Sequence, residues 1–168
     1  MSRVASYLVA LGVFVLDQAT KAWLRATLPL NETIPLWPGV FHITHTQNTG
    51  AAFSLLRGAT PLLIVTAILV IAGLLIAQHR AGRHLPPLLG LALALPLGGA
   101  LGNLLDRLRH GYVTDLLDFR LINFPIFNVA DSAITVGILL LAWRTLTVRE
   151  EPKPAEANPP ATEDAPAA

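Results

Sequence analysis

The chain alternates four long apolar stretches with more polar connections. The apolar stretches lie at about residues 4–23, 61–77, 85–105 and 131–148. The second and third contain no charged residue over about 17 to 21 positions, which is the length that spans the apolar core of a bilayer. The first and fourth carry their charges close to one end. Because every backbone amide inside lipid must be hydrogen-bonded within the protein, each stretch is predicted to form a transmembrane helix.

The connections predict little further structure. The loop at about residues 24–60 contains a strand-like run, Val40–Thr46, bounded by turn signals. The connection at about residues 106–127 is predicted to be a second loop, and segment 149–168 has the composition of a disordered tail. The predicted fold class is an all-α integral membrane protein: one domain, residues 1–148, with four transmembrane helices and a small strand-containing extramembrane loop.

Composition supports this class and excludes several kinds of chemistry. Only 14% of the residues are charged, against about a quarter in soluble domains. The chain has no cysteine, so it can form no disulfide, thiolate nucleophile or cysteine-ligated metal site. His42 and His45 are three apart in a strand-like run, which would place them on opposite faces, and no His-Glu-x-x-His or Gly-x-Ser-x-Gly motif occurs. We therefore expect no metal, no cofactor and no nucleic-acid partner.

The first apolar stretch has a second interpretation, as a cleaved signal peptide covering residues 1–27. Arg3 and the segment Arg25–Thr27 match such a peptide weakly. Asp17 and Lys21, however, follow the apolar run where a cleavage site requires small neutral residues. A retained helix is the favoured interpretation.

The distribution of basic residues does not fix the orientation in the membrane. With both termini on one side, six of the 12 Lys and Arg residues fall on each side. The short link at residues 78–84 carries Arg80 and Arg83 and no acid, which favours cytoplasmic termini.

Alternation of the four spans predicts one polar membrane face whatever the orientation. The far end of the first helix, both long loops, the end of the third helix and the start of the fourth must share one side. Asp17 lies roughly 20 Å along the first helix, at 1.5 Å per residue, and therefore towards the same side. The residues that should converge there are Asp17, Lys21, Asn48, Asn103, Asp106, Arg107, Asp115, Asp118, Asn128 and Asp131.

Asp115 and Asp131 are the strongest candidates for chemistry within this set. When two carboxyl groups lie close together, one keeps its proton while the other stays charged. The charged group can take a proton from water, and the protonated one can polarise a carbonyl, as in an aspartic protease. The alternatives are that Asp131 only caps the fourth helix and that Asp115 is a solvated loop acid.

Other candidates also have structural alternatives. Asp17 and Lys21 are four apart and can form an ion pair, with Lys21 reaching along the helix to the interface. Asn103 and Arg107 share a helix face and could orient the acids or bind a carbonyl. Gly98 and Gly102 have the small-xxx-small spacing of closely packed membrane helices. The stretch 48–53 is predicted to be a turn, and its small residues would also let a substrate backbone approach closely.

Five motifs together resemble the lipoprotein signal peptidases, the type II signal peptidases of bacteria. They are Asp17-Gln-Ala-Thr-Lys21, Asn48-Thr-Gly-Ala-Ala-Phe53, the segment 98–107, Gly111-Tyr-Val-Thr-Asp115 and Phe127-Asn-Val-Ala-Asp131-Ser. They occur in the family's order over nearly the whole chain to about residue 148. The tail at 149–168 is not part of the pattern, and the stretch between the two acids is short.

The resemblance implies a specific activity and site. It implies an aspartic endopeptidase of the bacterial inner membrane that removes the signal peptide from diacylglyceryl-modified prolipoproteins, N-terminal to the lipidated cysteine, without a cofactor. By the motif positions, Asp115 and Asp131 match the catalytic pair. The matching supporting residues are Asn48, Gly50, Asn103, Arg107, Asn128 and Ala130, with Asp17 and Lys21 as structural positions. The resemblance further implies cytoplasmic termini, a site at the periplasmic face, a strand-rich extramembrane loop and a lipid-modified substrate; we expect a monomer.

Two other classes of function fit the sequence less well than a peptidase. A proton- or ion-coupled transporter would place acids near the middle of the membrane and often shows a repeat, whereas these acids gather at one face. A purely structural membrane scaffold would explain the glycines and ion pairs but not the Asn, Asp and Arg residues collected on one side.

Overall fold

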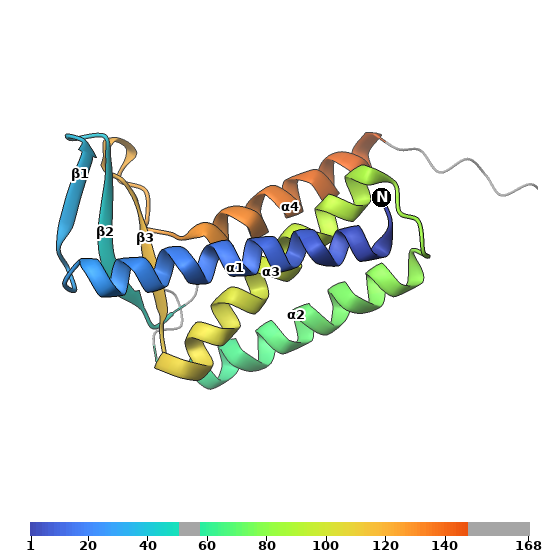
Figure 1. Ribbon diagram of the computed structural model, residues 1–168, viewed down its shortest axis with the longest axis horizontal. Coiled ribbons are helices and arrows are strands. Elements are labelled where there is room, and N and C mark those ends of the chain that lie inside the picture. Colours follow the sequence, from blue (N-terminus) through green and yellow to red (C-terminus); the bar gives the residue numbers. More distant parts are fainter. Residues whose placement is uncertain (51–57, 148–168) are drawn as a thin grey trace, which may run out of the picture.

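The structure, a computed structural model, describes residues 1–50 and 58–147. Within these residues, four long helices form a bundle with a small sheet at one end (Figure 1). Each helix is long and apolar enough to cross a membrane, which confirms the four helices predicted from the hydrophobic pattern. They are α1 (Arg3–Thr27), α2 (Thr60–Arg80), α3 (Pro87–His110) and α4 (Val129–Thr147).

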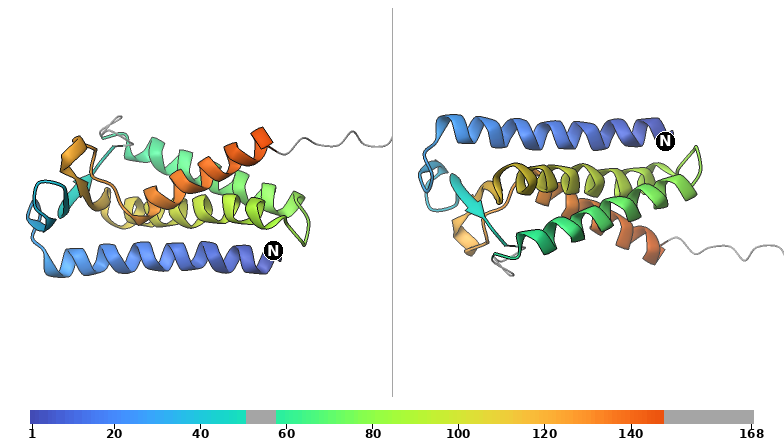
Figure 2. Two further views of the ribbon diagram at one scale, coloured as in Figure 1. Left: turned by 90° about the horizontal axis from the view of Figure 1, so that it is seen from above. Right: turned by 90° about the horizontal axis from the view of Figure 1, so that it is seen from below.

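Helix α3 is the centre of the bundle. It packs against each of the other three helices and lies between α1 and α2 in Figure 2. Gly98 lies so close to the carbonyl oxygen of Ala10 that a Cβ atom there would collide with the α1 backbone. Gly102 lies in the same way against the Asp17 carboxylate. The predicted close packing through these two glycines is therefore confirmed.

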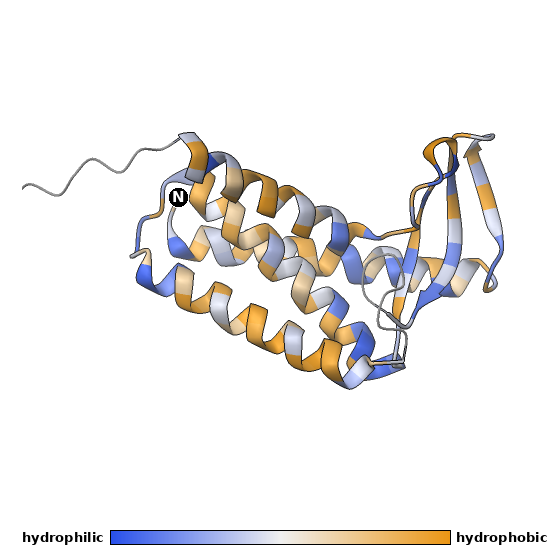
Figure 3. Ribbon diagram, turned by 180° about the vertical axis from the view of Figure 1, so that it is seen from behind, coloured by the Kyte–Doolittle hydropathy of each residue, from blue (hydrophilic) through white to orange (hydrophobic). Residues whose placement is uncertain are grey.

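The outer surfaces of the helices are apolar along their length. Figure 3 shows apolar residues over the bundle and hydrophilic residues concentrated near the sheet. Large side chains such as Leu69 on α2 and Leu139 on α4 are well exposed. A surface of this kind is stable in contact with lipid rather than water.

The sheet has three antiparallel strands in the order β1-β2-β3. They are β1 (Thr33–Trp37), β2 (Phe41–Asn48) and β3 (Val113–Phe119). The strand-like run at residues 40–46 corresponds to β2, whereas the sequence did not predict β1 or β3.

The prediction of a loop at residues 106–127 was wrong. Helix α3 continues to His110, β3 follows, and a short 3-10 helix, η2 (Arg120–Ile122), comes next. Most of β3 is buried, with Leu116 in a core cluster with Leu24 and Asp115 lining a cavity. Because apolar and polar residues occur on both faces of β3, the strand lacks the period of two that identifies a half-buried strand.

Strand β3 is fixed to both helices that flank it. Gly111 ends α3 with φ 80°, a left-handed conformation that favours glycine. The backbone N–H groups of Leu116 and Leu117 both donate to the carbonyl oxygen of Phe127, two residues before α4 begins. The sheet therefore lies directly at the ends of α3 and α4.

Two parts of the sequence interpretation lie outside the described residues. They are the 51–53 portion of the glycine-containing stretch and the tail at 149–168.

Candidate active site

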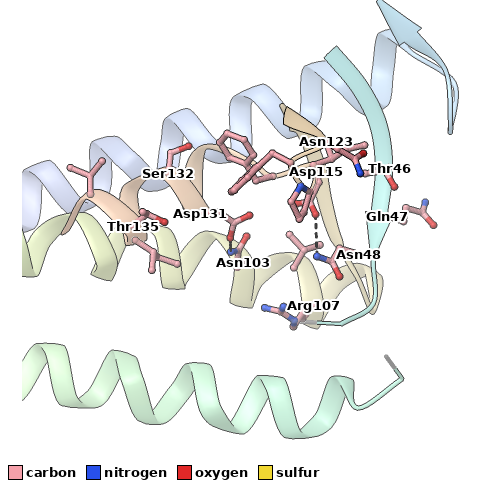
Figure 4. Close-up of a pocket in the computed structure, with 17 residues that line it drawn as sticks. Thr46, Gln47, Asn48, Asn103, Arg107, Asp115, Asn123, Asp131, Ser132 and Thr135 are labelled. Atoms are coloured by element: carbon pink, nitrogen blue, oxygen red, sulfur yellow. Dashed lines mark hydrogen bonds between the residues drawn. The ribbon is translucent and has the colours of Figure 1, made fainter. Parts of the chain in front are cut away.

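A cavity of about 1220 Å³ lies between the sheet and the ends of α3 and α4 (Figure 4). Asp115 from β3 and Asp131 from α4 both line it. The structure thus places the two predicted acids, 16 positions apart in sequence, at one cavity. Three of the predicted supporting residues also line it: Asn48, Asn103 and Arg107.

Asp131 lies in the first turn of α4 and takes part in its N-terminal cap. The side-chain oxygen of Asn128 accepts from the Asp131 N–H at 2.9 Å, and the Asp131 Oδ2 accepts from the Asn128 N–H at 3.3 Å. This reciprocal pair is a capping box, and the carboxylate also lies at the positive end of the helix dipole. Asp131 therefore does cap α4, but the cap uses only one of its two carboxylate oxygens, so capping does not account for the whole carboxyl group.

Asp17 caps the same helix from α1. Its Oδ1 accepts from the N–H of Ala130 at 3.0 Å. Ala130 is completely buried, and Gly102 on α3 leaves the space that the Asp17 carboxylate occupies. These contacts give Asp17 and Ala130 a shared function: they fix where α4 begins, and with it the position of Asp131.

Asp115 is buried in β3, with 1% of its surface exposed, so the alternative of a solvated loop acid is wrong. Burial, followed by the negative charge of Asp131, raises the pKa of Asp115 to about 7. Hydrogen bonds from Asn128 and Asn48 and the charge of Lys21 act in the opposite direction. A carboxyl group with this pKa can hold or release a proton near neutral pH.

Two amides hold the Asp115 carboxylate, and each can do so in only one orientation. Asn128 donates to Oδ1 at 2.6 Å and Asn48 donates to Oδ2 at 3.2 Å. The oxygen of the Asn48 side chain accepts from the N–H of Gly50, and that of Asn128 accepts from the N–H of Asp131. Because each amide oxygen already faces a backbone donor, each NH₂ group must face Asp115.

Asn103 holds the other carboxylate in the same manner. Its NH₂ group donates to the Oδ1 of Asp131 at 2.8 Å, and its oxygen accepts from the Nζ of Lys21 at 2.9 Å. An ammonium group has no acceptor, so the Asn103 oxygen must face Lys21 and its NH₂ group must face Asp131. A lysine outside the cavity lining therefore sets the hydrogen-bonding of an acid inside it.

Lys21 forms the predicted ion pair with Asp17 but does not reach the interface. Its Nζ lies 2.8 Å from the Asp17 Oδ2 and 3.1 Å from the Asp106 Oδ2, and the side chain has no exposed surface. The expectation that Lys21 extends to the membrane surface was wrong because two carboxylates and an amide oxygen compensate its charge inside the protein.

Asp106 was not singled out by the sequence, although it belonged to the polar set at this face. Its Oδ2 accepts from the backbone N–H of Thr114 at 3.0 Å, and its Oδ1 lies 3.7 Å from the guanidinium of Arg25. It thereby ties the start of β3 to the last turns of α3. The only available signal was its position three residues after Asn103 on the same helix.

Arg107 and Gly50 are joined on one side of the cavity. The Nη2 atom of Arg107 donates to the carbonyl oxygen of Gly50 at 3.0 Å. In Figure 4 the Arg107 side chain lies below Asn48, and Asp115 lies above Asn48. The guanidinium thus places a positive charge near the two acids.

Asp118 is the member of the polar set that lies apart from the site. Its Oδ2 accepts from Thr44 at 2.6 Å and from the Nε of Arg120 at 2.9 Å. It is absent from the lining of the cavity formed by the described residues.

The site as a whole can perform acid–base chemistry on a bound carbonyl. It presents two carboxyl groups of which one readily holds a proton, an arginine and several fixed amides. Among the described residues, no group of three His, Asp or Glu side chains is arranged to hold a metal ion.

Comparisons with known proteins agree with this arrangement. A family model described as signal peptidase (SPase) II matches residues 9–147. A protein of Moorella thermoacetica named lipoprotein signal peptidase is 46% identical over 142 residues, covering 83% of this chain and 91% of the relative. A protein of Gloeobacter violaceus with the same name is 46% identical over 153 residues, covering 91% of this chain and 87% of the relative.

The fold is also similar to that of solved membrane proteins. One, described as a bacterial membrane enzyme structure obtained by the in meso method at 2.3 Å resolution, superposes with a TM-score of 0.80 at 30% identity, covering 89% of this chain and 94% of the other. A second with the same description, at 1.9 Å resolution, gives a TM-score of 0.77 at 32% identity, covering 85% and 93%.

Proposed function

The chain belongs to the signal peptidase II family, and on this premise we propose that it is an aspartic endopeptidase with Asp115 and Asp131 as its catalytic pair. Its substrates are prolipoproteins whose conserved cysteine carries a diacylglyceryl group. Cleavage removes the signal peptide on the N-terminal side of that cysteine.

One observation carries this proposal: two carboxyl groups, the buried Asp115 and the half-buried Asp131, line one cavity at the ends of membrane helices, and fixed donors hold both of them. Asp115 accepts from Asn48 and Asn128, and Asp131 accepts from Asn103 and a backbone N–H. Such donors keep the carboxyl groups in place without reorganisation during the reaction.

The proposed reaction uses one proton shared by the pair. The charged carboxylate removes a proton from a water molecule as the oxygen attacks the scissile carbonyl, while the protonated carboxyl group donates to the carbonyl oxygen. The tetrahedral diol then collapses, the C–N bond breaks, and the departing nitrogen receives a proton from the pair. No covalent enzyme intermediate forms, and the proton belongs to the coupled pair rather than to one residue.

The location of the cavity suits a lipid-modified substrate. It is lined by the polar residues at the sheet end and by Ile134 and Val136 on α4. A diacylglyceryl chain could remain beside α4 in the bilayer while the peptide bond reaches Asp131 in the first turn. We place the termini in the cytoplasm and the sheet at the periplasmic face of the inner membrane. A monomer suffices, because one chain supplies both acids.

The test is cleavage of a diacylglyceryl-modified prolipoprotein by the purified protein and by Asp115→Asn and Asp131→Asn variants. Asparagine keeps the shape, and in position 131 keeps one acceptor for the helix cap, but it cannot carry the charge. We expect the cleavage rate to fall by about 10²- to 10⁴-fold in each variant. A folded variant that cleaves at the wild-type rate would show that the chemistry resides elsewhere.

Asp118→Asn provides the matched control. Asp118 is on the same strand as Asp115 but is bonded to Thr44 and Arg120 instead of facing the cavity. This variant should keep its activity, because Asp118 does not line the cavity formed by the described residues. Thermal unfolding of all three variants in detergent establishes that they are folded.

A further inference from the structure

The free end of the sheet carries a cluster of exposed apolar side chains outside the helix bundle. It consists of Leu36 and Trp37 at the end of β1 and Leu121 and Ile122 in η2, here called the sheet tip. Each is between 59% and 70% exposed. Figure 1 shows that this end of the sheet lies past the start of α4, on the same side of α1 as α4. Clusters of this kind on a folded protein indicate a contact surface.

A row of aromatic rings connects the sheet tip with the start of α4. Trp37 pairs with Phe41, which pairs with Phe119 across the next strand. The rings of Phe41 and Phe119 are 4.6 Å apart, and those of Phe119 and Phe127 are 5.9 Å apart. Phe127 lies two residues before α4. Phe119 is exposed and Phe41 and Phe127 are partly buried, so an aromatic row joins the start of a membrane-spanning helix to the sheet tip.

The neighbouring row of the same sheet is polar. His42 pairs with Asp118 in the register, and Asp118 bonds Thr44 and Arg120. Because side chains alternate between the two faces of a strand, this row faces the opposite side from Phe41 and Phe119. The two faces at this end of the sheet thus differ, with Phe41 and Phe119 on one face and a row of buried polar side chains on the other.

We propose that the sheet tip inserts into the interfacial layer of the bilayer beside α4. Tryptophan is enriched in this layer, and two further tryptophans, Trp23 near the sheet end of α1 and Trp143 near the opposite end of α4, are also exposed. Trp37 adds a third position on the side of Trp23. Because β3 is hydrogen-bonded to Phe127, the sheet tip lies at the level where α4 leaves the membrane.

Insertion of the sheet tip would hold the cavity at a fixed depth. Asp115 is on the same strand as Phe119, four residues earlier, and Phe124 and Phe127 both line the cavity. The aromatic row is therefore a rigid connection between the lipid interface and the cavity wall. This inference depends only on the chain being a membrane protein and not on the reaction it catalyses.

Site-directed spin labelling tests the inference directly, because the chain contains no cysteine. A nitroxide is attached to an Ile122→Cys variant in vesicles of phosphatidylethanolamine and phosphatidylglycerol. We expect the label to collide more often with oxygen, which partitions into lipid, than with a water-soluble nickel chelate. The control is Leu30→Cys, an exposed apolar residue after the end of α1 and outside the sheet tip, where the preference should be reversed.

Fluorescence of native Trp37 gives a second reading without altering the sheet tip. In a Trp23→Phe, Trp143→Phe variant, Trp37 should be quenched by lipids with a nitroxide at the headgroup and protected from aqueous iodide. The proposal would be overturned if iodide quenched Trp37 and the nitroxide at position 122 collided more often with the nickel chelate than with oxygen. Spin–spin broadening at Ile122 that disappears on dilution with lipid would also overturn it, because a second copy of the chain would then cover the surface.

Discussion

The Nζ of Lys21 donates to the side-chain oxygen of Asn103 over 2.9 Å, and this contact turns the Asn103 amide group towards Asp131. This contact can influence the reaction through Asp131 without touching the substrate itself. The lysine is fully buried on α1, and the acid that it influences through Asn103 is on α4. The ammonium group of Lys21 thereby connects α1, α3 and α4, and its removal should weaken the contacts among all three helices.

Lys21→Met should strongly destabilise the protein. The substitution leaves Asp17 and Asp106 buried without their shared counter-charge, and breaking a buried pair costs about 3–5 kcal/mol. The free energy of unfolding in detergent micelles measures this loss. The double variant Lys21→Met, Asp106→Asn should recover part of it, because one uncompensated charge is removed. Equal stability of Lys21→Met and the wild type would contradict the prediction.

Asn103→Ala should impair the reaction more than the fold. It removes the donor at 2.8 Å from the Asp131 Oδ1, so the carboxyl group is no longer held at the cavity wall. We expect kcat to fall by about 10²-fold, the effect of removing one pre-organised donor, with a smaller change in KM. Thr135→Val, a shape-conserving change on α4 in the same cavity, should leave kcat close to the wild-type value. Equal kcat values for the two variants would exclude a positioning function for Asn103.

The rate of cleavage should fall as the pH rises through about 7. Burial and the nearby charge of Asp131 raise the pKa of Asp115 to about 7, so the proton shared by the pair is lost above this pH. At low pH a second proton binds and no base remains, which gives a bell-shaped profile. The profile of kcat/KM against pH, measured with a substrate whose own groups do not titrate in this range, provides the test. A rate that is constant from acid to alkaline pH would rule out a shared proton.

Asn48→Ala should move the alkaline limb of this profile to higher pH. The hydrogen bond from Asn48 stabilises the charged form of Asp115 and lowers its pKa, so its removal raises that pKa and the proton is kept to a higher pH. The control is Gln47→Ala, a neighbouring amide that lines the cavity but is not among the donors that act on Asp115. An alkaline limb that moves equally in both variants, or to lower pH, would be inconsistent with this assignment.

The hydrophobic pattern predicts the helices because each span must satisfy its own backbone, and it predicts a shared polar face because successive spans alternate in direction. Asp115 and Asp131 could therefore be placed on one side of the membrane without a structure. The sequence could not predict that the two acids line the same cavity. Asp115 lies on β3, whose residues are buried on both faces and therefore give no strand periodicity.

The position of Lys21 could not be predicted for a different reason. A lysine near the end of a membrane helix normally reaches the interface, since burying an unpaired ammonium is costly. It stays inside only because Asp106 and Asn103 arrive from α3, 82 or more positions away in sequence. Such compensation depends on tertiary contacts that no local pattern encodes.

Gly102→Ala should destabilise the protein and reduce its activity. A Cβ atom at this position would collide with the Asp17 carboxylate, which caps α4 through the N–H of Ala130. Either α1 must move away from α3 or Asp17 must turn away from α4, and overpacking of this kind costs about 1–3 kcal/mol. The displaced cap would shift the first turn of α4, and with it Asp131, so kcat should fall together with the thermal midpoint.

Gly12→Ala separates this collision from the general effect of replacing a helical glycine. Gly12 lies within α1, and among the described residues no atom outside its own helix comes within 4 Å of the point where a Cβ atom would sit, so alanine there should leave activity unchanged. It should also raise stability by about 0.5–1 kcal/mol, because alanine has less backbone freedom to lose than glycine. Thermal unfolding and cleavage rates of the two variants, measured side by side, decide the matter. A Gly102→Ala variant that behaves like Gly12→Ala would show that the contact between Asp17 and α3 is not close enough to position α4.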